Sequence, residues 1–448
     1  MGPMTELPRK AVARTARLAA LPLGYAGRTA LGVGRRLGGT PAETVLSEVQ
    51  QRTAEQLFRT LGDLKGGAMK MGQALSIFES MLPEEIAAPY RDQLTRLQDS
   101  APPMAASTVN AVLARELGAG WHKLLVEFDP DPAAAASIGQ VHRGRWVDGR
   151  EVAVKLQYPG AGEALRADLK QMGRIARAFG TLVPGVDVKP LVAELRDRVE
   201  EELDYSLEAQ SQAAFAQAFR DDPDFHVPEV LAQTERLLVS EWVESSSSLA
   251  RLIAEGTAEE RAHYGGLYVR FLFQGPSRVG MLHADPHPGN FRVVPAADGG
   301  LGGLGVVDFG AVARLPENQL PSAIGTLLRI AMYDDYDDVL AGLREEGFVR
   351  PNIRVDTDEL RAYLNPFIEP ARHDSFVFSR DWMREQFQRV QDLRQPGSSV
   401  VLRLNLPPSY LLIHRVWVGC IGVLCQLGAE LPFREILEQS LPGFAEPD

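Results

Sequence analysis

Two short segments in the second half of this 448-residue chain constrain its fold more than any other part of the sequence. The first is His283-Ala-Asp-Pro-His-Pro-Gly-Asn290, and the second is Asp308-Phe-Gly, which follows a short hydrophobic run. Phosphoryl transfer needs one carboxylate near the attacking oxygen, and an amide oxygen and another carboxylate on Mg²⁺. Asp285, Asn290 and Asp308 supply this set. The five-residue offset lets a single loop direct Asp285 and Asn290 into one cleft.

The first segment permits two other interpretations. His283, Asp285 and His287 alternate like ligands along a strand, which would suit zinc or iron. The two prolines of the segment argue against a regular strand. The segment could also be a proline-rich turn around a buried aspartate. The Asp308-Phe-Gly sequence downstream favours phosphoryl transfer over both.

A second element is the alternating strand Val152-Ala-Val-Lys155. Its lysine could meet the α- and β-phosphates of a nucleotide, although a solvated lysine on an ordinary edge strand would look the same. Because a lysine side chain is long and flexible, it needs a carboxylate to hold it. Glu202 is the candidate, and its neighbours Glu200 and Glu201 are alternatives.

The glycine-rich loop that usually precedes such a lysine strand is missing from the sequence. No Gly-x-Gly-x-x-Gly or Walker A loop occurs before the lysine strand, and Ala133-Ala-Ala-Ala-Ser-Ile-Gly-Gln140 stands in its place. Alanine carries a Cβ, which keeps the backbone further from a phosphate than glycine does. We expect a loop that covers a nucleotide with altered geometry. The N-terminus of a helix is the alternative.

Apolar spacing and turn residues predict a helical extension, a small strand-bearing lobe and a large helical lobe. The predicted domains are a basic arm over 1–42, a helical extension over 43–125, a strand-bearing lobe over 126–243 and a helical lobe over 244–448. Helices are expected over 43–80, 105–117, 162–180, 188–220 and 416–427, the last buried, and strands over 140–147, 151–156 and 236–243. Asp148-Gly149 predicts one hairpin turn, and the five glycines of 299–305 predict another.

Charge and cysteine content exclude several classes of protein. With 47 basic and 59 acidic residues the net charge is −12, which argues against nucleic-acid binding by a global basic field. Two cysteines, Cys420 and Cys425, exclude a disulfide framework and fit a reducing compartment such as the cytoplasm. No apolar run reaches the length of about 18 residues that a membrane-spanning helix needs.

The first 40 residues differ from the rest of the chain, because they hold seven basic residues and one acidic residue. Such a segment can be a solvated basic arm, a peripheral contact with an anionic membrane surface, or an organellar transit peptide. The sequence leaves all three open.

In this order, the motifs resemble those of the UbiB-type (AarF-like) atypical kinases. The matching parts are the alanine-rich segment, the lysine strand, Glu202-x-Asp204, and the two segments 283–290 and 308–310, which we call the central segments. Lys70-Met-Gly-Gln73 matches the Lys-x-Gly-Gln motif of that family. The resemblance covers roughly residues 45–440. It implies an α+β, protein-kinase-like bilobal fold with the N-terminal helical extension folded over the active site.

The resemblance also implies roles for particular residues, with ATP or ADP and Mg²⁺ as cofactors. Lys155 and Glu202 would form an ion pair, Asp285 would take the catalytic-loop position, and Asn290 and Asp308 would bind the metal. Lys70 and Gln73 of the extension would lie near Asp204 and Glu208. The nucleotide would contact Ala134, Ala135, Ala136, Ser137 and Lys155 on one side, and Glu241, Trp242 and Val243 as the hinge against adenine.

The family is linked to ATPase activity and to isoprenoid quinone metabolism, chiefly ubiquinone biosynthesis. The resemblance therefore implies a Mg²⁺–ATP-dependent atypical kinase or ATPase whose partners are a lipid-like small molecule or proteins of a biosynthetic complex. A nucleotide-binding pseudokinase that acts as a scaffold is the alternative. A phosphotransferase of the aminoglycoside-kinase type has no reason to carry Lys70-x-Gly-Gln73. Unlike membrane-bound bacterial members, the sequence shows no transmembrane helices after residue 427, which leaves peripheral membrane contact through residues 1–40 or none.

Overall fold

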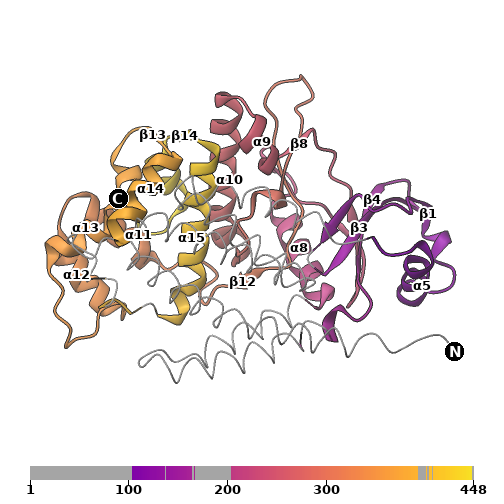
Figure 1. The fold of residues 1–448 in the computed structure, drawn as a ribbon, viewed down its shortest axis with the longest axis horizontal. Coiled ribbons are helices and arrows are strands. Elements are labelled where there is room, and N and C mark those ends of the chain that lie inside the picture. The colour runs from indigo at the N-terminus through magenta and orange to yellow at the C-terminus, as the bar shows by residue number, and fades with distance from the viewer. Residues whose placement is uncertain are drawn as a thin grey trace, which may run out of the picture. The chain divides into compact units, whose positions relative to one another are not determined.

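The computed structural model describes residues 103–136, 138–163, 166, 203–391, 400, 403–405 and 407–445. The chain divides into two compact units. Of the described residues, the first unit holds those of 103–147 and 154–203, and the second holds 148–153 and 204–445. Figure 1 gives the labels of the elements. The predicted helices over 43–80 and 162–180 lie largely or wholly outside the described residues.

The first unit is built from one helix and an antiparallel set of strands. Its elements are α5 (Ala106–Glu116), the short 3-10 helix η2 (Trp121–Lys123), β1 (Leu125–Phe128), β2 (Ala134–Ala136) and β3 (Gly139–Trp146). Both β1 and β2 pair antiparallel with β3. The predicted helix over 105–117 and strand over 140–147 are thus confirmed to within a residue.

Strand β4 (Glu151–Gln157) belongs to both units, because its first three residues lie in the second unit and its last four in the first. Val152, Val154 and Leu156 are fully buried, so one face of this strand is core and Lys155 lies on the other face. The turn before it confirms the prediction for Asp148-Gly149, since Gly149 has φ of +93° and Asp148 Oδ1 accepts the Arg150 N–H. The strand order of the sheet is β1-β3-β4-β7-β6, with β2 beside β3.

The alanine-rich segment differs from the predicted loop. Ala134–Ala136 forms strand β2, in which Ala135 lies opposite Gln140 of β3. Alanine is a poor strand former, and the pairing with β3 overrides its local preference. The alternative of a helix N-terminus is wrong for these residues.

The second unit begins with α8 (Tyr205–Ala218) and contains the long buried helix α10 (Ala258–Val279). A capping box at Thr257 and Glu260 starts α10, and Gly280, in the left-handed region at φ of 72°, ends it. Phenylalanines from distant parts of the chain pack into one cluster between these helices and the strands that follow. The cluster consists of Phe215, Phe219, Phe225, Phe271, Phe291 and Phe309.

Short strands of the second unit support the two central segments. A four-stranded sheet has the order β5-β11-β10-β8, and β9 pairs with β12. The hairpin of β10 and β11 confirms the turn predicted over 299–305. The strands are β5 (Phe225–His226), β6 (Val230–Thr234), β7 (Leu237–Glu241), β8 (Ser247–Ser248), β9 (Met281–His283), β10 (Phe291–Val293), β11 (Leu304–Val306) and β12 (Val312–Arg314), with η3 (Pro288–Asn290) between β9 and β10.

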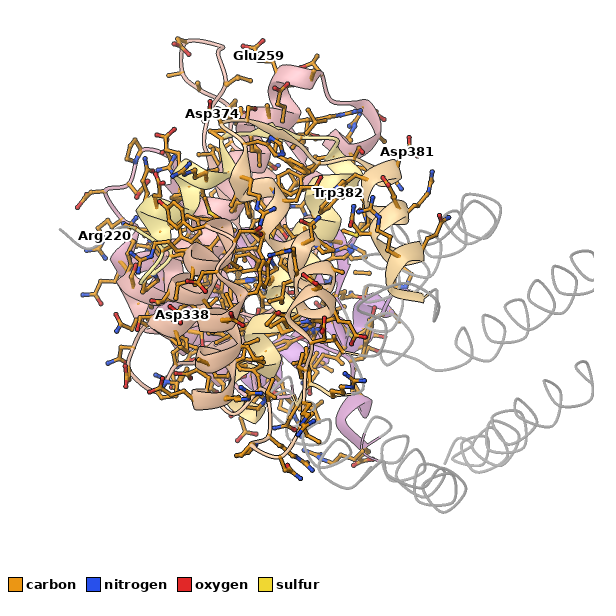
Figure 2. All side chains as sticks on the ribbon, turned by 90° about the vertical axis from the view of Figure 1, so that its left-hand side faces the viewer. Arg220, Glu259, Asp338, Asp374, Asp381 and Trp382 are labelled. Carbon is orange, nitrogen blue, oxygen red and sulfur yellow. The ribbon has the colours of Figure 1, made fainter. Side chains whose placement is uncertain are left out.

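The remainder of the second unit is mainly helical, as predicted. Its elements are α9 (Leu249–Glu255), α11 (Ser322–Met332), α12 (Tyr336–Glu345), α13 (Thr357–Ile368), η4 (Glu369–Arg372), β13 (Phe376–Val377), α14 (Arg380–Gln391), α15 (Pro408–Leu427), β14 (Glu430–Leu431) and α16 (Phe433–Ser440). Trp382 packs inward against Phe376 and Phe378, whereas Asp338 and Asp381 are exposed (Figure 2).

Helix α15 confirms the predicted buried core helix over 416–427. Cys420 and Cys425 are both buried on it, and burial raises the pKa of each thiol. Among the described residues, no helix is both long enough and apolar enough to span a membrane.

Candidate functional site

Asp285 and Asn290 lie together in the loop that joins β9 to β10. Both are almost fully buried, at 8% and 7% exposure. The loop folds back on itself: the Asn290 N–H donates to the His287 carbonyl at 3.0 Å, and the Asn290 side-chain amide donates to the Asp285 carbonyl in a longer contact of 3.4 Å. In this orientation the amide oxygen of Asn290 remains the end that can bind a cation.

The second central segment is tied to the first by backbone and side-chain bonds. The Val307 N–H donates to the Asn290 carbonyl at 3.0 Å, and Phe291 pairs with Val306 across the β10–β11 hairpin. His283 Nε2 lies 2.6 Å from the Asp308 carbonyl, to which it donates. These bonds hold the two segments side by side.

Gly310 explains why a glycine follows Asp308-Phe309. Its N–H donates to Asp308 Oδ1 at 2.9 Å, which bends the chain around the carboxylate. A Cβ at Gly310 would lie 3.2 Å from Asp308 Oδ1 and 3.5 Å from Glu208 Oε2. Asp308 and Glu208 therefore direct carboxylate oxygens at the same small region of backbone.

Glu208 lies beside the second central segment. It is 5% exposed and next to Gly310. Glu208, Gln212 and Phe215 occur at positions i, i+4 and i+7 of α8 and are all buried. Its expected position near Lys70 and Gln73 stays a prediction, because these two residues lie outside the described residues.

Asp204 has a structural part in the same helix. It is the N-cap of α8, and its side chain accepts the Ser206 N–H at 2.9 Å. Its expected partners Lys70 and Gln73 lie outside the described residues, as do Glu202 and Ser137. The predicted roles of these four residues stay predictions.

The oxygen donors fit Mg²⁺ better than zinc or iron. Asp308, Asn290 and Glu208 offer hard carboxylate and amide oxygens, the ligands that Mg²⁺ prefers. Among the described residues, no group of three or more His, Cys, Asp or Glu side chains is arranged to hold a metal ion. His283 and His287 instead bond to the Asp308 carbonyl and the Gly289 N–H. These partners argue against a zinc or iron site on His283, Asp285 and His287.

A buried tyrosine of α10 bonds to the loop between β9 and β10. The Tyr268 hydroxyl donates to the Pro286 carbonyl at 2.6 Å, next to Asp285. Burial is the main cause that raises the pKa of Tyr268 well above its usual value, so the phenol stays protonated and keeps its donor. The side chain also packs edge-on against Phe291.

The predicted hinge lies at the end of β7, where its polar groups already have partners. Glu241 accepts hydrogen bonds from Arg150 Nη1 and from the Glu229 N–H, both at 3.1 Å. The Trp242 N–H donates to the Glu151 carbonyl at 2.9 Å. The Glu241 carboxylate thus ties the end of β7 to Arg150 and Glu229. The predicted contact of this hinge with adenine stays a prediction.

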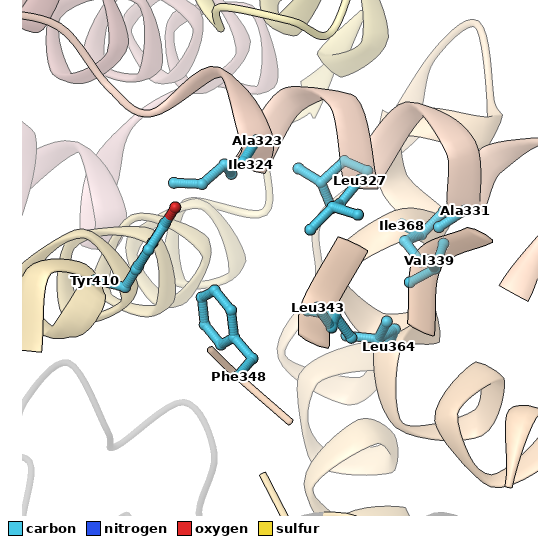
Figure 3. A pocket seen from close by; sticks show the side chains of 11 residues that line it. Ala323, Ile324, Leu327, Ala331, Val339, Leu343, Phe348, Leu364, Ile368 and Tyr410 are labelled. Carbon is cyan, nitrogen blue, oxygen red and sulfur yellow. The ribbon is translucent and has the colours of Figure 1, made fainter. Parts of the chain in front are cut away.

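A separate apolar cavity of about 130 Å³ lies among α11, α12, α13 and the start of α15 (Figure 3). Leu327, Leu343 and Phe348 are among its lining side chains, and Tyr410 contributes the one hydroxyl. That hydroxyl donates to Glu346 at 2.5 Å, so its bonding capacity is directed away from a ligand. None of the residues of the two central segments lines this cavity.

Comparison with known proteins agrees with this geometry. The family model described as "ABC1 atypical kinase-like domain" matches residues 96–341, which is more than half of the chain. The chain belongs to this family. The matched range contains Lys155, Glu208 and both central segments, and the fold of these atypical kinases is kinase-like. The resemblance stated from the motifs is thereby confirmed.

Relatives from several organisms carry related names. The chain is 28% identical over 450 residues to the chloroplastic Protein ACTIVITY OF BC1 COMPLEX KINASE 3 of Arabidopsis thaliana, and 27% identical over 463 residues to the mitochondrial atypical kinase coq-8 of Caenorhabditis elegans. Each match covers 98% of this chain but only 58% and 59% of the relative. The chain thus spans about three-fifths of the length of these relatives.

A solved structure resembles the chain more closely. The Rv3197–erythromycin complex from Mycobacterium tuberculosis is 42% identical in sequence, with a TM-score of 0.70. The match covers 91% of this chain and all of that one. Together with the family match, it confirms the predicted kinase-like fold.

Proposed function

We propose that the protein is a Mg²⁺-dependent atypical kinase or ATPase that uses ATP. The observation that carries the proposal is the joining of Asp285, Asn290 and Asp308 by the Val307–Asn290 and His283–Asp308 bonds. Asp285 would orient the attacking hydroxyl or water and accept its proton, and Asn290 and Asp308 would hold Mg²⁺. The ion, when bound, neutralises charge on the transferred phosphoryl group.

We propose Glu208 as a further candidate, beside Glu202, for the carboxylate that holds Lys155. In kinases the strand lysine pairs with a glutamate on a helix, and Glu208 is on helix α8. Glu208 is buried and lies against the Asp308-Phe-Gly segment. A glutamate there can orient the lysine by attracting its positive charge.

The test is phosphate release from ATP with Mg²⁺ by the full chain. Asp285→Asn should lower turnover about a hundredfold or more, the usual contribution of a positioned acid–base group. Glu208→Gln should raise the KM for ATP and lower turnover, while Asp337→Asn, an exposed aspartate of α12, should match the wild type. Turnover in the wild type that Asp285→Asn leaves unchanged would contradict the proposal. MgATP binding without turnover would favour the pseudokinase alternative.

The acceptor side of the proposal is lipid metabolism, in particular of isoprenoid quinones. Relatives named as atypical kinases of mitochondria and chloroplasts support an activity in lipid-rich compartments. Proteins of a biosynthetic complex are the proposed macromolecular partners. Metabolite profiling of a deletion strain complemented with wild type or Asp308→Asn tests this part. An unchanged quinone and lipid profile in both strains would contradict it.

A second candidate function is binding of a macrolide. The 42%-identical solved structure is a complex with erythromycin, and the shared fold covers nearly all of both chains. The cavity of about 130 Å³ is far too small for a whole macrolide, which measures several hundred cubic ångströms, so the ligand would need another surface. Calorimetric titration of the full chain with erythromycin tests this candidate, and no measurable heat at saturating concentration would remove it.

A further inference from the structure

Three consecutive hydrogen bonds cross the first unit from residue 104 to residue 129. The Met104 N–H donates to Gln140 Oε1 at 2.8 Å, Gln140 Nε2 lies 2.7 Å from His142 Nε2, and His142 Nδ1 lies 2.8 Å from the Asp129 carbonyl oxygen. Gln140 and His142 are 1% and 0% exposed. Buried polar side chains that are connected in this way fix one geometry.

The bonds assign every proton in the series. Because Gln140 Oε1 accepts from Met104, its amide group turns its N–H toward His142. His142 Nε2 must then accept, so the ring proton is on Nδ1 and donates to the Asp129 carbonyl. This arrangement requires a neutral imidazole. An imidazolium would direct a second N–H at the amide nitrogen of Gln140.

The surroundings keep the ring neutral. Burial lowers the pKa of His142, and it outweighs the Asp129 hydrogen bond and the charges of Asp129 and Asp131, which raise the pKa. Phe128 stacks on the imidazole at 4.8 Å, and Trp121 packs against Phe128. Glu127 on β1 and Arg145 on β3 form an ion pair of 3.3 Å. The other titratable or charged groups on the neighbouring elements are His122 and Lys123 on η2, Arg143 on β3, and Glu151 and Lys155 on β4.

The same glutamine is part of the alanine-rich hairpin. In the β2–β3 register Gln140 lies opposite Ala135, and the Ala133 N–H donates to the Val141 carbonyl at 2.8 Å. On the other side of the hairpin, the Tyr158 N–H donates to the Ile138 carbonyl at 2.9 Å. The hairpin is thus held at its tip by Tyr158, and Gln140, in the middle of the pairing, bonds through its side chain to Met104 and His142.

We propose that Gln140 and His142 form a positioning relay, which holds the alanine-rich strand in register for nucleotide and makes that register depend on the backbone at residue 104. The proposal rests on the nucleotide-binding role given above to Ala134–Ala136. Neither Gln140 nor His142 touches the nucleotide. They act through β2. Residue 104 stands just before helix α5, so the relay links the backbone ahead of this helix to β3, the strand that pairs with β2.

The first test removes the relay with Gln140→Met in the full chain. We expect exchange of the Met104 amide to become about tenfold faster, exchange at Ala133–Ala136 to rise with it, and MgADP affinity to fall about threefold or more. Gln233→Met, at an exposed glutamine of β6, is the matched control and should change none of these. Faster exchange at Met104 with unchanged protection of β2 would overturn the proposal.

The outcomes separate the relay from the proposed function. If the wild type binds no MgADP, the nucleotide role is wrong, while amide exchange at β2 still decides whether the relay positions this strand. If exchange at β2 rises and MgADP affinity stays the same, the relay positions the strand but not the nucleotide, and the proposal is wrong.

The second test reverses the pH dependence with Gln140→Glu. One carboxylate oxygen can accept from Met104, but the other then requires a proton on His142 Nε2, which raises the pKa of His142. In the wild type the lowered pKa gives stability above pH 6.5 that is lost as the pH falls. In the variant the raised pKa gives stability below pH 6.5 that is lost as the pH rises.

The measurement is the melting temperature of both proteins from pH 5.5 to pH 8. The gap between wild type and Gln140→Glu should be at least twice as large at pH 8 as at pH 5.5. Gln233→Glu should show a constant gap from the wild type. A constant gap for Gln140→Glu would overturn the proton assignment, and if this variant does not fold at either pH, Gln140→Met decides the proposal.

Discussion

Replacing Tyr268 with phenylalanine removes one oxygen atom that bonds to the loop of Asp285 and Asn290. The Tyr268 hydroxyl is fully buried and donates to the Pro286 carbonyl at 2.6 Å. The aromatic ring, which packs against Phe291, is the same in tyrosine and phenylalanine. The change therefore isolates one hydrogen bond and leaves the apolar packing in place.

The size of the effect follows from burial. Removal of a donor leaves the buried Pro286 carbonyl without this bond, which costs about 1–3 kcal/mol, whereas loss of an exposed hydroxyl costs little. For a unit of this size, that corresponds to a fall in melting temperature of roughly 2–12 °C. Because Pro286 adjoins Asp285, turnover should fall more than affinity for MgATP.

Thermal unfolding followed by circular dichroism and phosphate release measure the two effects. Tyr333→Phe is the control, since Tyr333 is 60% exposed and its hydroxyl should contribute less than about 0.5 kcal/mol. If Tyr268→Phe melts within 1 °C of the wild type and hydrolyses ATP at the same rate, Tyr268 does not support the loop and the reasoning is refuted.

Other parts of the chain give further expectations. Burial raises the thiol pKa of Cys420 and Cys425, so iodoacetamide at pH 8 should label neither cysteine in the native protein and both in guanidinium. Mass spectrometry measures the labelling, and fast labelling of the native protein would contradict the burial of these thiols. If residues 1–40 contact anionic lipid, co-sedimentation with phosphatidylserine vesicles should weaken steeply with salt, and arm-deleted protein that sediments equally would leave the solvated arm. Lys70→Ala should change the affinities for ATP and ADP if the extension acts as a lid. Ala135→Gly should change these affinities because it lets the backbone approach the phosphates. If calorimetry gives wild-type affinities for both variants, the lid and the nucleotide-binding strand are contradicted.

Local sequence features predicted those elements whose cause is local. The Asp148-Gly149 turn needs a glycine at positive φ, and the alternation of Val152, Val154 and Leu156 needs a half-buried strand. Helix α5 confirms its predicted limits because the break after it is local as well, at Gly118 with φ of +87°.

The features that the sequence did not predict depend on contacts between distant residues. Glu208 is buried against Gly310, about a hundred positions away, and Ala134–Ala136 becomes a strand only because β3 pairs with it. The spacing of Asp285 and Asn290 indicated phosphoryl transfer, but it could not show that His283 bonds to the Asp308 carbonyl and not to a metal. Side-chain partners of this kind follow from the tertiary fold.

The most direct test of the central claim is isothermal titration of the full chain with ADP, with and without Mg²⁺. The account predicts that the wild type binds MgADP, that Asp308→Asn loses most of the Mg²⁺-dependent part of the affinity, and that the exposed control Asp337→Asn retains it. Wild-type protein that shows no binding at saturating MgADP, or an Asp308→Asn variant with unchanged Mg²⁺ dependence, would contradict it.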